Sequence, residues 1–143
     1  MKKVRIDIFD SHINETDDDT PERESSEMSI FGNLEETDEG YVISYTELEG
    51  EFAGCSTVLN VKKDCVTITK SGDYKYDFML EANKRHSCNY STPYGSFIIG
   101  LMASEIKLDK DDDSLNLLLR YSIDCNSSLL SQNELNIKVR ELI

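Results

Sequence analysis

Apolar and polar residues alternate with a period of two along most of the chain. In the first such segment, residues 3–9, Val4, Ile6 and Ile8 are apolar and the residues between them are polar. Side chains of a β-strand point alternately to its two faces, so this pattern predicts a strand with one buried face. The same reasoning predicts further strands at residues 28–34, 41–48, 55–63, 65–71, 74–80, 85–91, 96–108, 115–125 and 135–140.

The predicted strands are joined mostly by short turns, and no stretch between them has the period of a helix. Gly40 and Gly72 each stand between two strands, as is typical of tight hairpin turns. Many short strands at regular spacing favour a β-sandwich or a β-barrel. Short connections favour up-and-down order, and closure removes exposed sheet edges. We therefore predict an all-β single domain over residues 1–143, an antiparallel up-and-down β-barrel of about 8–10 strands whose first and last strands pair.

One segment lacks apolar residues altogether. Residues 14–27 contain seven acids, one base and no side chain that could be buried. Such a composition is typical of a solvated segment, so we predict an acidic flexible loop. The three aspartates at 17–19 do not form a calcium loop, because an EF-hand ligand position would fall on Pro21.

The most apolar segment is the strand predicted at 96–108. It is apolar on both faces from Phe97 to Ala103, which predicts cover on both sides, by an appended segment or by a second copy in a homodimer. Gly100 in its middle indicates a bend or a bulge. The preceding Thr92-Pro93-Tyr94-Gly95 has the residues of a type II-like turn; the alternative is that Tyr94 covers the mouth of the barrel.

Charge and composition restrict the classes of partner. The 28 acidic and 15 basic residues give a net charge of -13. Nucleic acid and anionic membrane both require a basic surface, so neither is expected as a partner. The chain has no apolar run of about 18 residues that could span a membrane and no apolar signal-peptide core, so we expect a cytoplasmic protein.

Motifs for metals and cofactors are missing from the sequence. Cys55, Cys65, Cys88 and Cys125 lack Cys-x-x-Cys spacing and are expected to be small buried or half-buried side chains. Two histidines are too few for a histidine metal centre. The sequence has no nucleophile elbow, Walker loop or His-Glu-x-x-His motif, and we expect no cofactor.

A family resemblance rests on Tyr90-x-Thr92-Pro93-Tyr94-Gly95, with Tyr45-x-Glu47, Lys70-x-Gly72 and Tyr121. With these motifs the chain resembles a bacterial family of small calycin-like β-barrels of unknown function, the YwiB-like proteins, over nearly its whole length. The resemblance implies a barrel of eight to ten strands, similar in shape to lipocalins, and implies no activity. The chain departs from the family pattern at Lys70, where arginine is usual, and at Ser104, where threonine is usual.

A ligand site inside such a barrel would place polar side chains on inward faces of the strands. The candidate ligand-binding residues are Tyr45 and Glu47 on one strand and His86 and Tyr90 on another. Tyr121 and, at the mouth of the barrel, Tyr94 are further candidates. The alternative is that the tyrosines pack the core and His86 lies at the rim. Both arrangements satisfy the alternating pattern.

Three functions follow from these alternatives. The first is a barrel that binds a small, partly apolar ligand. The second is a non-catalytic interaction or homo-oligomerising module with an interior filled by side chains. The third is an enzyme that uses His86, Glu47 or Cys88, for which the sequence offers the weakest support.

Overall fold

Ten strands and no helix make up the part of the chain that the computed structural model describes, residues 2–14, 22–125 and 128–142. The predicted all-β fold is therefore confirmed. The strands are β1 (Lys2–Asn14), β2 (Glu22–Glu36), β3 (Gly40–Thr46), β4 (Ser56–Lys62), β5 (Cys65–Ser71), β6 (Tyr76–Glu81), β7 (Arg85–Thr92), β8 (Gly95–Lys110), β9 (Ser114–Cys125) and β10 (Ser128–Glu141).

Each strand pairs in antiparallel fashion with the next one along the chain, except β6 with β7. The first and last strands pair as predicted, from Val4 opposite Glu141 to Asn14 opposite Ser131. The sheet therefore runs from β6 through β1 and β10 to β7 and curls into a nearly closed barrel.

The seam between β6 and β7 is closed at its two ends only. At one end Lys75 and Ser91 exchange two backbone hydrogen bonds of 2.8 Å each, and at the other the Asn83 N–H, in the turn from β6 to β7, donates to the carbonyl of Ala103 on β8. Between these points, the rings of Tyr76 and Tyr90 stack at 5.3 Å across the gap. Aromatic side chains thus replace a backbone ladder over the middle of the seam.

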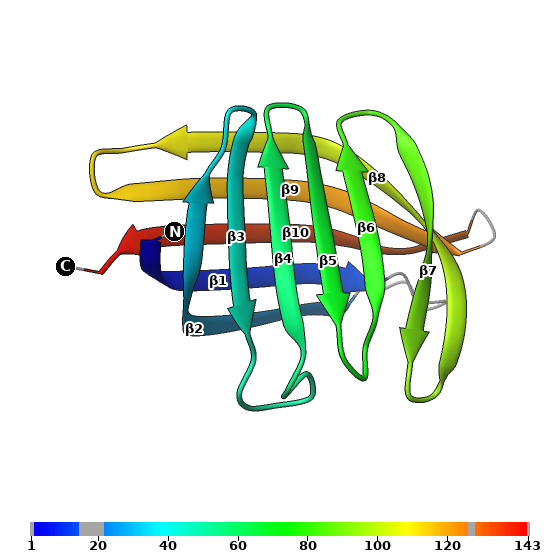
Figure 1. Ribbon diagram of the computed structural model, residues 1–143. Coiled ribbons are helices and arrows are strands. Elements are labelled where there is room, and N and C mark those ends of the chain that lie inside the picture. Colours follow the sequence, from blue (N-terminus) through cyan, green and yellow to red (C-terminus); the bar gives the residue numbers. More distant parts are fainter. Residues whose placement is uncertain (1, 15–21, 126–127, 143) are drawn as a thin grey trace.

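The barrel is flattened into two layers. Figure 1 shows the short strands β3–β6 side by side in front, with β1, β8, β9 and β10 running nearly at right angles behind them. β2 belongs to both layers, since Gly32 faces Val4 on β1 and Tyr45 on β3. A Cβ atom at Gly32 would collide with the Ser44 carbonyl and with Ile6, so only glycine fits this corner.

The prediction that β8 is covered on both faces is not what the single chain shows. Leu101 and Ala103 are fully buried inside the barrel, whereas Ile98 and Met102 point outward and are 72% and 45% exposed. The outward side chains continue the apolar run without contributing to the core, which is why the pattern suggested two covered faces.

Gly100 does not form the predicted bulge, because the register shift on β8 lies between Ala103 and Glu105. Gly100 instead makes room for Arg85, which crosses it from β7 to reach Asp124 on β9 with hydrogen bonds of 2.6 and 3.0 Å.

Part of the acidic segment predicted as a loop over 14–27 is strand in the structure. Asn14 belongs to β1 and residues 22–27 to β2, where backbone pairing with β1 orders a stretch that has no apolar side chain. The remainder of the segment, 15–21, lies outside the described residues. The strand predicted to begin at 135 likewise begins earlier, at Ser128.

Candidate functional site

The inner face of the barrel changes character from one end to the other. On β1 the inward side chains run Val4, Ile6, Ile8 and then Asp10; on β9 three leucines are followed by Tyr121. Because neighbouring strands run in opposite directions, the polar inward residue comes last on some strands and first on others, and all of these residues lie at the same end of the barrel. On β4, for example, Thr57 precedes Leu59 and Val61. The aliphatic end forms a packed core, and the other end surrounds a cavity of about 960 Å³.

A buried ion pair lies on the wall of this cavity. Lys70 on β5 follows two apolar inward positions, and its ammonium group donates to Glu47 Oε2 at 3.2 Å. The two side chains are only 8% and 10% exposed. The Lys70 Nζ also lies 4.0 Å from the centre of the Phe52 ring, a cation–π contact that compensates part of its lost hydration.

The connection between β3 and β4 is fixed over this pair. Glu47 donates its backbone N–H to Cys55 and accepts one from Gly54, and Gly50 and Gly54 have φ values of 85° and 86°, which glycine adopts readily. The Phe52 ring packs edge-on against another aromatic ring, that of Tyr74, at 4.7 Å. The loop therefore places its acidic residues at the mouth in a defined arrangement.

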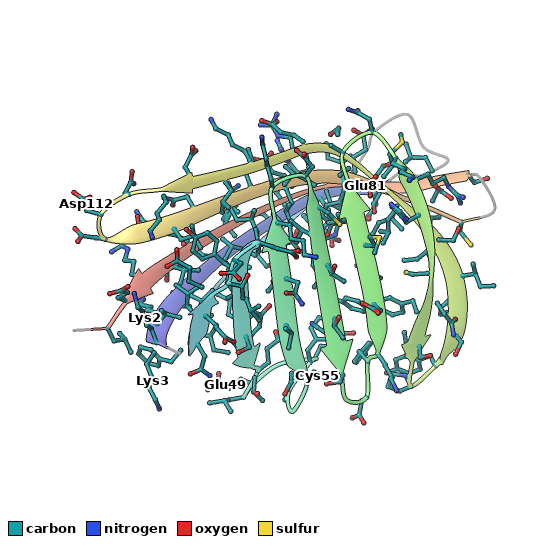
Figure 2. The ribbon with its side chains drawn as sticks, turned by 45° about the horizontal axis from the view of Figure 1, so that its top comes forward. Lys2, Lys3, Glu49, Cys55, Glu81 and Asp112 are labelled. Carbon is teal, nitrogen blue, oxygen red and sulfur yellow. The ribbon has the colours of Figure 1, made fainter. Side chains whose placement is uncertain are left out.

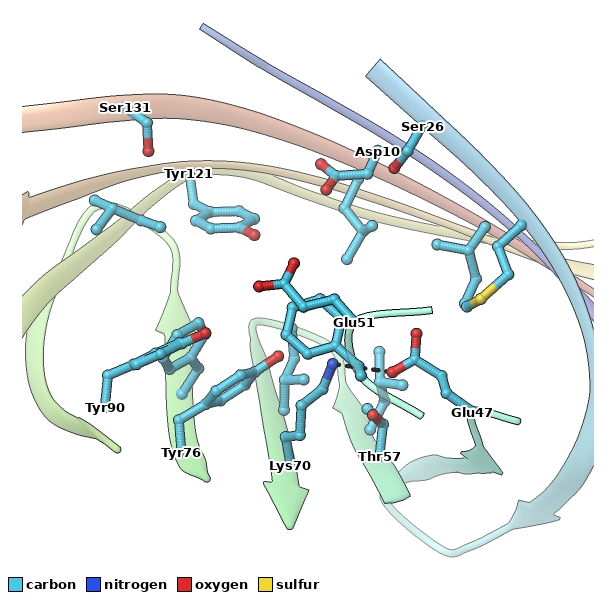
Figure 3. Close-up of a pocket in the computed structure, with 18 of the residues that line it drawn as sticks. Asp10, Ser26, Glu47, Glu51, Thr57, Lys70, Tyr76, Tyr90, Tyr121 and Ser131 are labelled. Carbon is cyan, nitrogen blue, oxygen red and sulfur yellow. Dashed lines mark hydrogen bonds and ion pairs between the residues drawn. The ribbon is translucent and has the colours of Figure 1, made fainter. Parts of the chain in front are cut away.

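Glu51 in this loop accepts a hydrogen bond of 2.9 Å from the Tyr74 hydroxyl. This bond raises the pKa of Tyr74 to about 12, because the neighbouring carboxylate holds the phenolic proton. Figure 3 shows Glu51 among the cavity residues, with Lys70 and Glu47 joined beside it.

Four tyrosines line the cavity: Tyr45, Tyr76, Tyr90 and Tyr121. Burial raises the pKa of each phenol, that of Tyr45 to about 12. All four are therefore neutral at physiological pH. They offer aromatic faces, hydroxyl donors and hydroxyl acceptors, but no negative charge.

Two polar groups on the cavity wall, within the described part of the chain, are less well satisfied than the Lys70–Glu47 pair. The Thr57 hydroxyl is fully buried and meets no partner in hydrogen-bond geometry, although Tyr45, its neighbour across β3 and β4, lies near enough for Thr57 to lower the pKa of its phenol. The Asp10 carboxylate is half-buried, and the charged group that acts on it is His12, two residues further along β1. Burial raises the pKa of Asp10, since removal from water disfavours its charged form. Buried polar groups normally have hydrogen-bond partners, so the Thr57 hydroxyl is an exception within the cavity.

Of the six side chains nominated from the sequence, the structure places four on the cavity wall: Tyr45, Glu47, Tyr90 and Tyr121. The other two lie elsewhere. Tyr94 is 88% exposed in the turn between β7 and β8 and is not part of the cavity wall. His86 shares the inward face of β7 with Tyr90, as the alternation predicts, but lies nearer the opposite end of the barrel.

His86 approaches Glu81 at the end of β6, with 3.7 Å between Nε2 and Oε1. Figure 2 shows Glu81 at the opposite end of the short strands from Glu49 and Cys55, which flank the cavity side. The structure therefore does not bring His86 together with Glu47, because His86 and Tyr90, four residues apart on β7, reach different ends of the interior. Burial raises the pKa of the neighbouring Cys88 thiol to about 11, which suppresses its nucleophilic thiolate.

Sequence reasoning missed Lys70, Thr57, Asp10 and Glu51 as cavity residues. For Lys70 a signal was present, since it continues the inward phase of Val66 and Ile68 and a lysine in that phase must be partnered. Glu51 had no such signal, because it lies in a loop without periodicity.

No cluster of three or more His, Cys, Asp or Glu side chains able to hold a metal ion occurs among residues 2–14, 22–125 and 128–142. The same described ranges contain no helix with the length and apolarity needed to cross a membrane.

Comparisons with known proteins agree with the architecture and name no activity. A family model described as a domain of unknown function (DUF1934) matches residues 11–137. Among solved structures, the crystal structure of the ywiB protein from Bacillus subtilis is similar with a TM-score of 0.72 and 16% identity, over 99% of this chain and 94% of that one. At this identity the similarity shows the fold alone. None of the curated proteins matches the chain.

Proposed function

We propose that this chain, which belongs to the family described as a domain of unknown function (DUF1934), binds a small, partly apolar molecule inside the barrel. The family description names no activity, so the proposal is argued from the cavity. The observation that carries this proposal is the cavity of about 960 Å³, within the range of small-molecule sites, which extend from about 300 to 1,000 Å³. Barrels of about eight strands either fill with side chains or hold one small ligand, as lipocalins do.

The composition of the wall supports the same proposal. Aliphatic and aromatic side chains such as Ile68, Phe78 and Ile99 supply most of the surface, and a few polar groups converge on it. Such a wall binds an apolar body and orients it through a small number of hydrogen bonds. The unpartnered hydroxyl of Thr57 is one group that a ligand would satisfy.

The direct test is native mass spectrometry of the protein purified from its own host, which reports any retained small molecule together with the subunit count. A matched pair of variants assigns the binding to the cavity. Ile123→Trp places a large ring in the cavity wall, whereas Ser122→Trp places it on the other face of β9. The natural chain has no tryptophan, so each variant also carries a unique fluorophore.

We expect the retained molecule to be present in the natural protein and in the Ser122→Trp variant and lost from Ile123→Trp. Retention in all three proteins would place the ligand outside the barrel. A ligand-free protein that also fails to bind apolar probes in solution would overturn the proposal.

A second candidate function, association with another copy of the chain, rests on the outward side chains of β8. Ile98 and Met102 are exposed there, but only these two apolar residues of β8 contribute, and isolated exposed apolar residues are common on monomers. Sedimentation of the natural protein and of an Ile98→Lys variant tests it: a dimer that this substitution dissociates would support association.

A further inference from the structure

The charges around the cavity are unbalanced. Five acidic residues are among those that line it, Asp10, Glu27, Glu47, Glu49 and Glu51, and Lys70 is the only basic residue among the described lining residues. Asp10 and Glu27 come from β1 and β2, while Glu49 and Glu51 come from the loop after β3. Two separate parts of the barrel therefore contribute acidic groups to one cavity.

Lys70 is not available to an incoming anion. Its ammonium group is bonded to Glu47 at 3.2 Å and lies against the Phe52 ring at 4.0 Å. An anionic ligand would have to pass the acidic residues at the mouth and displace Glu47 from a buried pair. Both steps are unfavourable, since removing one member of a buried pair leaves an uncompensated charge.

Asp10 and Glu51, in contrast, retain acceptor capacity toward the cavity. Asp10 is held by no short side-chain contact and interacts only electrostatically with His12 on its own strand, and Glu51 uses Oε1 for the Tyr74 hydroxyl. Figure 3 shows the carboxylates of Asp10, Glu47 and Glu51 directed into the cavity. Burial of the Asp10 carboxylate outweighs the effect of His12, and a cation placed beside this carboxylate would reduce the cost of its burial.

The remaining wall suits a cation with an apolar body. The rings of Tyr76 and Tyr90, stacked at 5.3 Å, and the ring of Tyr121 present aromatic faces that attract ammonium groups. The buried Thr57 hydroxyl, which has no described partner, can accept a hydrogen bond from an N–H donor.

From these observations we infer that the ligand is an organic amine, protonated at neutral pH, whose ammonium group lies among Asp10, Glu51 and the tyrosine rings and whose apolar body fills the aliphatic part of the cavity. This inference rests on the proposed function, because it specifies the ligand of the same cavity. It requires that charge, and not apolar area alone, decides which molecules bind.

The experiment uses three probes that share one ring system and differ in charge: 1-naphthylmethylamine, 1-naphthalenemethanol and 1-naphthoate. Their affinities for the full chain are measured by isothermal titration calorimetry at low and at high salt. We expect the amine to bind at least about tenfold more tightly than the alcohol, a difference of about 1.4 kcal/mol, and the carboxylate to bind most weakly. The preference for the amine should decrease as salt screens the carboxylates.

Matched variants separate the cavity from the general negative charge of the protein. Asp10→Asn combined with Glu51→Gln should bring the affinity for the amine down to that for the alcohol. Asp38→Asn combined with Asp64→Asn removes the same charge from two exposed turns and should leave the preference for the amine unchanged.

The other possible results of these measurements would overturn either the inference about the amine or the proposed function. Equal affinity for amine and alcohol, or the tightest binding for the carboxylate, would overturn the inference and leave the proposed function standing. Amine binding that survives Ile123→Trp would place the amine on the acidic surface and would overturn the inference as well. If none of the three probes binds and the host protein retains no molecule, the proposed function itself fails.

Discussion

The buried pair of Lys70 and Glu47 allows a quantitative test of how the cavity is built. We consider Lys70→Met, Glu47→Gln and the double variant. Lys70→Met keeps the length and apolar stem of the side chain but removes the cation that Glu47 faces at 3.2 Å. It therefore isolates the charge from the packing of the stem against the loop.

The geometry sets the expected magnitude. At 3.2 Å and an effective dielectric constant of about 20, the Coulomb attraction is about 5 kcal/mol before desolvation is subtracted. Breaking a buried pair costs about 3–5 kcal/mol, and the open cavity allows water to reach the remaining carboxylate, which favours the lower limit. We therefore expect Lys70→Met to reduce the free energy of unfolding by about 3 kcal/mol and Glu47→Gln by about 2 kcal/mol, with a coupling of about 2 kcal/mol in the double variant.

The assay is urea unfolding at neutral pH, followed by far-UV circular dichroism and by tyrosine fluorescence, since the chain has no tryptophan. The exposed pair of Lys62 and Glu39, with the same kind of contact at 3.0 Å, is the matched control and should show no measurable coupling. Additive effects of the two cavity substitutions, or a cost for Lys70→Met below about 1 kcal/mol, would refute the reasoning that this pair is buried and coupled.

Three further predictions concern other parts of the barrel. Asp10→Asn should stabilise the protein slightly at neutral pH, by under about 0.5 kcal/mol, because burial raises the folded-state pKa of Asp10. The ionised carboxylate therefore lowers the free energy of unfolding above that pKa and has no such effect below the ordinary value of 3.8. Urea unfolding should give equal midpoints for the two proteins below pH 3.8. Gly100→Ala should lower the Tm by about 3 °C in a calorimetric scan, and most of this effect should vanish in an Arg85→Ala background, since the three atoms nearest to the new methyl group all belong to the Arg85 side chain that reaches Asp124. Cys88, whose pKa burial raises to about 11, should react with iodoacetamide roughly a hundred times more slowly in the native protein than in urea, as followed by mass spectrometry of its peptide; equal rates would contradict its burial.

The strands and the general order of the barrel could be predicted from the sequence because their cause is local. Val4, Ile6 and Ile8 alternate with polar residues, and the leucines of β9 do the same, so the buried face of each strand is recorded in its own residues. The pairing of β1 with β10 followed from the need to close the edges of a long meander.

The cavity residues could be predicted only in part, because the residues of a single strand do not determine its register with the neighbouring strands. Tyr45 and Glu47 were found from their shared face, but nothing local shows that Lys70, on a strand two places away in the sheet, ends beside Glu47. His86 was misplaced for the related reason that alternation gives the face of a residue and not its height along the barrel. Alternation also does not show whether an apolar outer face is covered, and in the single chain Ile98 and Met102 on β8 are exposed.

The two ends of the interior are best understood together. Side chains such as Val4, Ile6 and Leu119 are fully buried at one end, and their apolar area supplies the stability that the other end does not. At the cavity end, an ion pair, a half-buried carboxylate and an unpartnered hydroxyl replace aliphatic side chains, and each lowers stability relative to a filled core. A barrel selected for stability alone would continue the aliphatic pattern past Ile68 instead of placing Lys70 next on the same face. The coincidence of these unfavourable choices at one end, drawn from separate strands, indicates that the space between them has a use.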